Sequence, residues 1–509
     1  MAYRDLSNFI ETLDKAGELV RIKTQVSPIL EIAEITDRVS KRQGAANKAL
    51  LFENVEGSDF PVLINAMGSY KRMNMAMKTE NLDQLGEDIQ TFLKLAEGSN
   101  LLAKLKKAPK IPRLAAVFPI RSPLPAPCQE VVHTGDAVDL TKLPVLQCWP
   151  EDGGRFITLP HVYTRDPDSG AQNVGMYRLQ IYDKNTTGMH WHWHKDGREI
   201  YEKYRQLGGR MPVSVALGAD PVITFAGACP LPKMLNETML AGFLRKMPVT
   251  LTKCVTNDID VPASSEFVIE GYVDVTEELR LEGPFGDHTG YYSLADMYPV
   301  FHVTAITHRQ NPIYPTTIVG KPPQEDCYMG KAIERMFLPL IRMQAPDIID
   351  MSFPWEGVFH NCVIVSIDKK YPAHAHKIMN TVWGTGQMMY TKMVIVVDKH
   401  VDVHNYSQVA FHVFNNIDAG RDLQISHGPL DALDHSSPMP FMGNRLGIDA
   451  TRKWPEEGHT REWPKEIDMD EATKALVDRK WESYGLPTRA RGRKPSGFGI
   501  KKLTTKGRA

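Results

Sequence analysis

The densest group of residues that could do chemistry lies in two neighbouring stretches of the chain. One stretch reads Asn173-Val-Gly-Met-Tyr-Arg178, and the other, Met189-His-Trp-His-Trp-His-Lys195, carries histidines at 190, 192 and 194. If the second stretch is a β-strand, its period of two places the three imidazoles on one face and both tryptophans on the other. Three aligned imidazoles beside an arginine and an asparagine are as consistent with a functional site as with hydrogen-bonded structural histidines. These stretches alone do not assign a function.

A second group of chemical interest is the loop from Glu282 to Asp287, Glu-Gly-Pro-Phe-Gly-Asp. Its two glycines and proline predict a tight turn that can direct both carboxylates into one cavity, although a solvated turn has the same composition. A carboxylate paired with arginine stays ionised, whereas one in an apolar setting has a raised pKa and can hold a proton. Such a difference would separate a structural acid from a proton donor. Glu237 stands at the start of a predicted helix, where capping is an equal alternative to a functional role.

Several long motifs follow one another in a fixed order: LPVLQCWPEDGG, QNVGMYR, PVSVALGADP, NDIDVPASSEFVIEGY, EGPFGDHTGYYS, LDHSSP and GIDATRKWP. On these motifs the chain resembles the UbiD family of decarboxylases over roughly residues 1 to 480. The resemblance implies prenylated FMN, a divalent metal that is usually manganese, and potassium. It also implies reversible, non-oxidative decarboxylation of aromatic or α,β-unsaturated acids.

The resemblance further implies roles for individual residues. Asn173, Glu237 and His194 correspond to metal ligands, with His192 as a competing candidate for the histidine position. Oxygen and nitrogen ligands of this kind suit manganese or magnesium better than a metal that prefers thiolates. The residues that correspond to cofactor contacts are Met176, Tyr177, Arg178, His190, Trp191, His192, Lys195, Asp196 and Lys392.

Arg178, Glu282 and Asp287 match the catalytic constellation of the family. In this interpretation Asp287 delivers a proton to the carbon that has lost CO2, while Arg178 and Glu282 fix its geometry and orient the substrate carboxylate. The planar fork of arginine suits a carboxylate because it can bind both oxygens. His435, in LDHSSP, falls where relatives that act on hydroxylated arenes can carry a histidine near the substrate. A plain loop histidine is the alternative for this residue.

The resemblance leaves the substrate open. The leading hypothesis is decarboxylation of a hydroxylated aromatic acid, such as 4-hydroxy-3-polyprenylbenzoate in quinone biosynthesis, with another aryl acid or an aryl-CoA thioester as the alternative. A flavin reductase is the alternative from another class, although no GxGxxG fingerprint follows a predicted strand. A flavin prenyltransferase is expected to supply the cofactor, and a homodimer or homohexamer is expected.

The elements that must position these residues fall into three predicted domains, because 509 residues exceed what a single core supports. Residues 1–120 are predicted to form an α/β domain, with helices near 5–17, 29–39 and 81–96 and strands in ALLFENV and FPVLINAM. Residues 121–325 predict strands in MPVSVALG, PVITFAGA, EFVIEGYVDV, PVFHVTAITHR and PIYPTTIVG, which favours a barrel or sandwich. The family resemblance specifies a flavin-reductase-like split β-barrel.

The third predicted domain, residues 326–487, has a second α/β pattern. Helices are expected at 326–343 and 373–383, strands at 361–367 and 392–397, and a last helix within 463–484 that packs on a neighbouring subunit. Residues 488–509 predict a disordered basic tail. The fold class is therefore α+β and α/β multidomain.

Composition excludes several classes of protein. Hydrophobic residues make up 42% of the chain and charged residues 24%, which disfavours wholesale disorder and long coiled coils. The six cysteines form no CxxC pair, so a disulfide scaffold and a structural zinc site are disfavoured and a reducing cytoplasm is expected. No apolar run approaches the ~18 residues of a membrane span. The whole chain has a formal net charge of −1, and the basic tail contributes eight positive charges from Lys and Arg. Residues 1–487 therefore carry a net charge of −9, which makes nucleic acid an improbable partner for this part of the protein.

Overall fold

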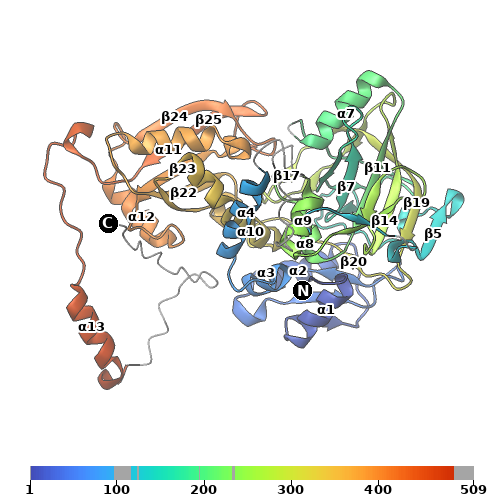
Figure 1. The fold of residues 1–509 in the computed structure, drawn as a ribbon, viewed down its shortest axis with the longest axis horizontal. Coiled ribbons are helices and arrows are strands. Elements are labelled where there is room, and N and C mark those ends of the chain that lie inside the picture. The colour runs from blue at the N-terminus through green and yellow to red at the C-terminus, as the bar shows by residue number, and fades with distance from the viewer. Residues whose placement is uncertain (1, 97–115, 123–124, 194, 232–235, 487–509) are drawn as a thin grey trace. The chain divides into compact units, whose positions relative to one another are not determined.

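The computed structural model describes residues 2–96, 116–122, 125–193, 195–231 and 236–486. Two compact units make up the chain: Met1–Glu80 with Glu87–Ile333, and Asn81–Gly86 with Glu334–Ala509 (Figure 1). The first unit takes in both the N-terminal segment and the strand-rich segment. The division into three domains stays a prediction, and the basic tail lies outside the described residues.

The N-terminal segment forms an α/β layer, as predicted. A four-stranded sheet has the order β1-β2-β3-β20. Helix α1 begins after Asp5, whose carboxylate accepts a hydrogen bond from the Asn8 amide at 2.9 Å and caps the helix. Helix α3 was not predicted. The bounds are α1 Leu6–Lys15, β1 Leu19–Ile22, α2 Glu31–Ser40, β2 Ala49–Phe52, β3 Val62–Ile64, α3 Tyr70–Met77, α4 Asp83–Ala96 and β20 Tyr314–Pro315.

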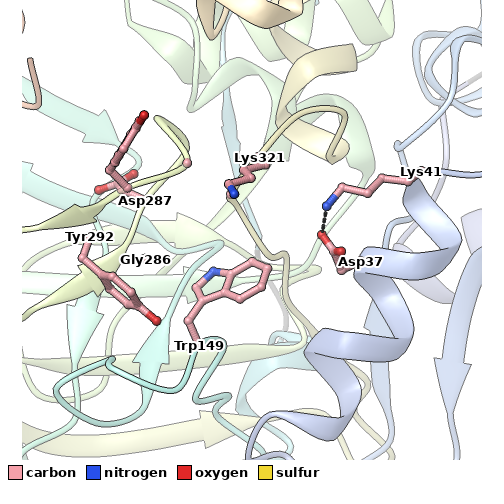
Figure 2. A pocket seen from close by; sticks show the side chains of 10 residues that line it. Asp37, Lys41, Trp149, Gly286, Asp287, Tyr292 and Lys321 are labelled. Atoms are coloured by element: carbon pink, nitrogen blue, oxygen red, sulfur yellow. Dashed lines mark hydrogen bonds and ion pairs between the residues drawn. The ribbon is translucent and has the colours of Figure 1, made fainter.

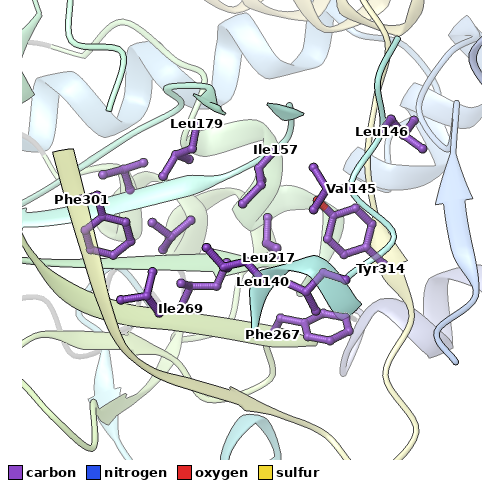
Figure 3. Close-up of a cluster of buried hydrophobic side chains, with 14 of the residues drawn as sticks. Leu140, Val145, Leu146, Ile157, Leu179, Leu217, Phe267, Ile269, Phe301 and Tyr314 are labelled. Carbon is purple, nitrogen blue, oxygen red and sulfur yellow. The ribbon is translucent and has the colours of Figure 1, made fainter. Parts of the chain in front are cut away.

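The strand-rich segment is built on one antiparallel sheet. Its strand order is β10-β19-β14-β11-β7-β8, and β5 also pairs with β19. Side chains from its central strands, among them Leu217, Phe267 and Ile269, are fully buried in one apolar core (Figure 3). Burial of this apolar surface is the main term that stabilises the layer. The bounds are β5 Val131–Thr134, β7 His161–Arg165, β8 Gln172–Gly175, β10 Thr186–Gly188, β11 Arg210–Leu217, β14 Phe267–Asp274 and β19 Val300–His308.

Shorter elements surround this sheet. The strands are β4 Ile120–Arg121, β6 Phe156–Ile157, β9 Leu179–Gln180, β12 Thr250–Lys253, β13 Asp260–Pro262, β15 Arg280–Glu282, β16 Phe285–Gly286, β17 Tyr292–Ser293 and β18 Asp296–Tyr298. The helices are α7 Asp196–Leu207, α8 Pro221–Ala226 and α9 Glu237–Arg245.

The strand predicted in PVITFAGA is wrong, because these residues begin helix α8. Asp220 caps the helix by accepting a hydrogen bond from the Val222 amide at 2.9 Å, and Pro221 occupies the first helical position. Arg245 in turn binds the other oxygen of Asp220 at 2.8 Å. Every residue of α8 is buried, so the sequence has no polar face from which a helical period could be read. PIYPTTIVG contributes only the two residues of β20.

The second unit contains a mixed five-stranded sheet with the order β21-β22-β23-β25-β24, which confirms the predicted α/β character. None of the side chains of α13 is buried, so its docking on a neighbouring subunit stays a prediction. The bounds are α10 Glu325–Gln344, β21 Ile348–Ser352, β22 Cys362–Ile367, α11 His374–Trp383, β23 Met393–Asp398, α12 Tyr406–Asn416, β24 Leu423–Pro429, β25 Met442–Asp449 and α13 Glu471–Lys480.

Two global features bear on the sequence predictions. All six cysteines are free thiols, five of them buried. Among the helices of the described ranges, none combines the length and the hydropathy that crossing a membrane requires.

Glu266, which precedes β14, is a buried carboxyl whose ionisation opposes folding. Burial raises its pKa from 4.5 to about 7, although the Ile313 amide donates a hydrogen bond to it. Because the pKa of Glu266 is higher in the folded than in the unfolded protein, its contribution to the free energy of unfolding is fully present in acid. This contribution is lost as the pH rises through about 7, where the buried carboxyl must ionise. We expect Glu266→Gln to be more stable than the parent by up to roughly 3 kcal/mol near pH 8, and the two proteins to converge toward about pH 4.

The measurement is the midpoint of thermal unfolding as a function of pH. Glu278→Gln, at an exposed position, is the control. Parallel pH curves for the parent and Glu266→Gln would contradict the prediction.

Candidate active site

Arg178 is buried between two carboxylates. Its Nε and Nη2 donate to the two oxygens of Glu282 at 2.8 and 3.1 Å, and its Nη1 lies 2.5 Å from Oδ2 of Asp287. Ser293 accepts a further hydrogen bond from Nη2 at 3.0 Å, and the guanidinium carbon lies 4.6 Å from the centre of the Phe285 ring. Glu282 is fully buried, and Arg178 and Asp287 are 9% and 7% exposed. The sequence prediction that these three residues converge is confirmed in geometry.

Two small hairpins hold the carboxylates. Glu282 ends β15, which pairs with β18, whereas Asp287 directly follows β16, which pairs with β17. Between them, Gly283 has a φ of +93°, a conformation that favours glycine. Arg178 comes from the link between β8 and β9, so the cluster joins segments that are about one hundred residues apart in sequence. The loop is therefore built into the sheet region and is not a solvated turn.

Asp152 fastens the β16 segment to the preceding loop. One of its carboxylate oxygens accepts a hydrogen bond from the Gly286 amide at 2.7 Å, and the other accepts from the amides of Cys148 and Trp149. A Cβ atom on Gly286 would lie 2.1 Å from the Trp149 ring, so only glycine fits there. This close packing fixes the backbone position of Asp287.

The two carboxyls do not show the opposed pKa shifts that the sequence suggested. Burial raises the pKa of Glu282, but hydrogen bonds from His190 and Arg178 outweigh this effect and lower it to about 2. Burial also raises the pKa of Asp287. Hydrogen bonds from His288 and the positive charge of Arg178 outweigh this effect and hold the pKa of Asp287 well below its usual range. Both side chains are therefore ionised in the free protein.

The stretch from Met189 to Trp193 is not a strand, since β10 ends at Gly188. Its side chains nevertheless alternate. His190 Nδ1 lies 3.0 Å from Glu282, and its Nε2 lies 2.5 Å from Nε2 of His192, whereas Trp191 is buried in the apolar core. The ring of Tyr298 packs against the His190 ring in a tilted arrangement, with 4.3 Å between the ring centres. His190 thus contacts Oε2 of Glu282, the oxygen that also accepts a hydrogen bond from Nη2 of Arg178.

A pocket of about 380 Å³ opens beside Asp287. Trp149, Tyr292 and Lys321 contribute to its wall, and Figure 2 shows the Lys41–Asp37 ion pair at the end away from Asp287. This volume falls in the range of small-molecule sites. The lining combines aromatic rings with two lysines and two carboxylates, so its aromatic surface suits an aromatic ligand while its charges cancel in the free protein.

The predicted metal ligands Asn173 and Glu237 belong to two segments, β8 and the start of α9, that are joined by a hydrogen bond. Asn173 lies on β8, and the amide of the next residue, Val174, donates to Oε2 of Glu237 at 3.3 Å. Glu237 is the first residue of α9, and burial raises its pKa to about 7. A divalent cation beside this carboxylate would offset the cost of burying its charge, so the residues fit a hard metal ion. His194 lies outside the described residues, so the choice between His192 and His194 stays open.

Three of the predicted cofactor contacts, Tyr177, Lys195 and Asp196, lie at the start of α7. Lys195 is the N-cap residue of α7, Asp196 is its first residue, and the Gly197 amide donates to the Tyr177 hydroxyl at 3.4 Å. Met176 is half-buried in the link that leads to Arg178. The first turn of α7 already carries two carboxylates, those of Asp196 and Glu199, so the binding of a cofactor phosphate by Lys195 at this helix N-terminus stays a prediction.

Lys392 and His435 belong to the second unit. Lys392 forms an ion pair with Asp434 at 2.9 Å and also contacts Ser436, while His435, between these two residues, is exposed. Their part in the site stays a prediction.

Sequence reasoning missed four residues that shape the site: Asp152, His288, Ser293 and Lys321. Asp152 stands inside the family motif WPEDGG, and His288 and Ser293 stand inside DHTGYYS, so a signal was present for all three. The position of Lys321 on the pocket wall depends on the fold and had no local signal.

Comparison with known proteins covers all three segments. The N-terminal, Rift-related and C-terminal domain models of 3-octaprenyl-4-hydroxybenzoate carboxy-lyase (UbiD) match residues 10–89, 121–322 and 327–450. An uncharacterized protein of Archaeoglobus fulgidus is 49% identical over 483 residues, which are 94% of this chain and 98% of that protein.

Two solved structures are also similar. Vanillic acid decarboxylase of Sedimentibacter hydroxybenzoicus in its closed form has a TM-score of 0.82 at 27% identity and covers 96% of this chain and 100% of its own. An evolved dimeric form of the UbiD-class enzyme HmfF of Pelotomaculum thermopropionicum, in complex with prFMN, has a TM-score of 0.75 at 27% identity, with coverage of 92% and 98%. With a mixed α and β fold, three matching domain models and a relative at 49% identity, the chain belongs to the UbiD family of carboxy-lyases.

Proposed function

We propose that the chain is a prenylated-FMN-dependent decarboxylase of a hydroxylated aromatic acid. The observation that carries this proposal is the guanidinium of Arg178, buried between Glu282 and Asp287 beside a pocket of small-molecule size. The likeness to a vanillic acid decarboxylase and to a prFMN complex supports the substrate class and the cofactor.

The contacts of Arg178 suggest how a substrate carboxylate enters. Glu282 occupies two guanidinium nitrogens, and His190 also binds it, so this carboxylate is held by two residues. Asp287 holds Arg178 through Nη1 alone. An incoming carboxylate therefore displaces Asp287 more readily than Glu282.

Displacement changes the protonation of Asp287. Away from Arg178 and next to a second carboxylate, its pKa rises and it can take up a proton. When CO2 leaves, this proton passes to the ring carbon, and the aspartate is ionised again. His288 Nδ1 lies 2.9 Å from Asp287 and is partly exposed, so it can carry the replacement proton from solvent.

The cofactor and the metal complete the proposal. When bound, prenylated FMN supplies an electron-accepting ring for the electron pair that CO2 leaves behind. Asn173 and Glu237, with His194 or His192, would hold Mn²⁺ next to the cofactor phosphate, and potassium would be a second ion. Tyr177, Lys195 and Asp196 would line the phosphate side of this site.

Within this class the substrate is a hydroxylated benzoate, and 4-hydroxy-3-polyprenylbenzoate is one candidate. His435 would polarise the ring hydroxyl. Hydride transfer from a nicotinamide would not need the buried Arg178, Glu282 and Asp287, so the flavin reductase alternative is disfavoured.

The subunits are proposed to form a homo-oligomer through the C-terminal segment. Leu476 of α13 and Tyr484 after it are 42% and 47% exposed, and Ile467 before α13 is fully exposed. Apolar side chains exposed in this number favour contact with a second copy.

The proposed activity predicts CO2 release from the holoenzyme after coexpression with a flavin prenyltransferase. We expect turnover of vanillate or 4-hydroxybenzoate, slower turnover of benzoate, which lacks the hydroxyl, and no consumption of NADH. Headspace CO2 and NADH absorbance are the measurements. NADH oxidation without CO2 release would favour the reductase.

Replacing the proposed proton donor tests its role. Asp287→Asn keeps the shape and removes the proton, so we expect turnover to fall roughly 100-fold or more while the flavin stays bound. The matched control is Asp296→Asn, an exposed carboxylate on β18. Steady-state kinetics and the flavin spectrum are the measurements, and full activity in Asp287→Asn would remove the assignment.

Metal binding should depend on Glu237. We expect Glu237→Gln to weaken Mn²⁺ binding at least roughly tenfold. Loss of a residue that only hydrogen-bonds to a metal ligand already lowers metal affinity by about this factor, and loss of the ligand itself should lower the affinity at least as much. The control is Glu199→Gln on the exposed side of α7. Electron paramagnetic resonance of free Mn²⁺ measures binding without turnover, and equal affinities for the two variants would count against a metal at Glu237.

A further inference from the structure

The second unit holds a cluster of two histidines and a glutamate that the proposed reaction does not use. His400 follows β23, His412 lies on α12, and Glu466 lies in the segment before α13. Their potential ligand atoms all lie within 4.8 Å of one another. Nε2 of His400 is 3.3 Å from one oxygen of Glu466, and Nε2 of His412 is 3.9 Å from the other.

His412 is the buried member of the cluster. It is only 4% exposed, and its Nε2 has no hydrogen-bond partner among the described residues, although it faces Glu466. A buried imidazole nitrogen without a partner costs free energy, which a bound ligand would recover. Burial also lowers the pKa of His412, which favours the neutral form that binds metals.

We propose that His400, His412 and Glu466 bind a divalent transition metal ion such as Zn²⁺. Two imidazole nitrogens and one carboxylate oxygen are ligands that zinc prefers, with water in the fourth position. Ligand atoms about 2.1 Å from a tetrahedral ion lie roughly 3.4 Å apart. The separations from Glu466 to the two histidines, 3.3 and 3.9 Å, are close to this value, while the ligand atoms of the two histidines lie within 4.8 Å of each other and would draw closer around the ion.

The site has a supporting residue in Asn416. Its side-chain nitrogen lies 3.3 Å from Nδ1 of His412 and also donates to the carbonyl of Ala450. A metal ion bound to Nε2 of His412 requires the ring proton to lie on Nδ1. The Asn416 side chain must then turn its amide oxygen toward Nδ1 to accept this proton in a hydrogen bond, and its nitrogen gives up the hydrogen bond to the Ala450 carbonyl. An aspartate at this position would accept the Nδ1 proton without turning.

The ion would have a structural consequence. Glu466 lies in an exposed segment without regular structure, and neighbouring Ile467 is fully exposed. Coordination would attach this segment to β23 and α12 and so fix the chain that leads into α13. The site is distinct from the Asn173–Glu237 pair, which belongs to the first unit.

The test titrates the full chain with Co²⁺, using the visible absorption of the tetrahedral ion, and then adds Zn²⁺ as competitor. A Glu237→Gln background reduces binding at the other proposed metal site. We expect absorption that Zn²⁺ abolishes, binding at least roughly tenfold weaker in Glu466→Gln and His400→Ala, and tighter binding in Asn416→Asp. His400 and Glu466 are about half exposed, so these two substitutions leave the packing intact.

Glu462→Gln, at a nearby exposed position, is the matched control and should bind as the background does. A second readout is tryptic cleavage at Lys465, which Zn²⁺ should slow in the background protein and not in Glu466→Gln. Equal Co²⁺ affinity in Glu466→Gln and Glu462→Gln, or no tetrahedral absorption at all, would overturn the proposal.

Discussion

The central constraint on the site is the burial of Arg178 with its two carboxylate partners. A guanidinium in an apolar environment is costly unless its hydrogen bonds are satisfied, and here Glu282, Asp287 and Ser293 satisfy them. Removing either carboxylate would leave buried guanidinium donors without their hydrogen-bond acceptors. The two hairpins and the link between β8 and β9 must therefore meet at one point.

The arrangement is asymmetric, and in the proposed mechanism this asymmetry gives the two acids different roles. Glu282 is fixed by a two-pronged contact from Arg178 and by His190, whereas Asp287 has a single contact to Arg178 and reaches toward solvent through His288. One acid can thus hold the arginine in place while the other gives way. The hydrogen bond from His288 and the charge of Arg178 hold the pKa of Asp287 low in the free protein, and we propose that this pKa rises when a substrate carboxylate takes its place at Arg178.

Sequence patterns predicted the elements that have a clear period or a clear end. The apolar run that forms β14 is almost continuously buried and ends at Asp274, and α1 has a capping aspartate, Asp5. Residues 221–226 could not be assigned from period because all of them are buried, although Asp220 before Pro221 was an available helix signal. The convergence of Arg178 with Glu282 came only from family motifs, since a pairing across about one hundred residues has no local signature. The low pKa of both acids depends on contacts that only the fold supplies.

The most direct test of this account is the ionisation state of Asp287, followed by infrared or carbon NMR spectroscopy of labelled aspartate, with Asp287→Asn to assign the signal. The account predicts a carboxylate that stays ionised throughout the accessible acid range in the free protein and gains a proton when an aromatic carboxylate binds. A group that titrates at its ordinary pKa in the free protein, or that stays ionised with the ligand bound, would contradict it.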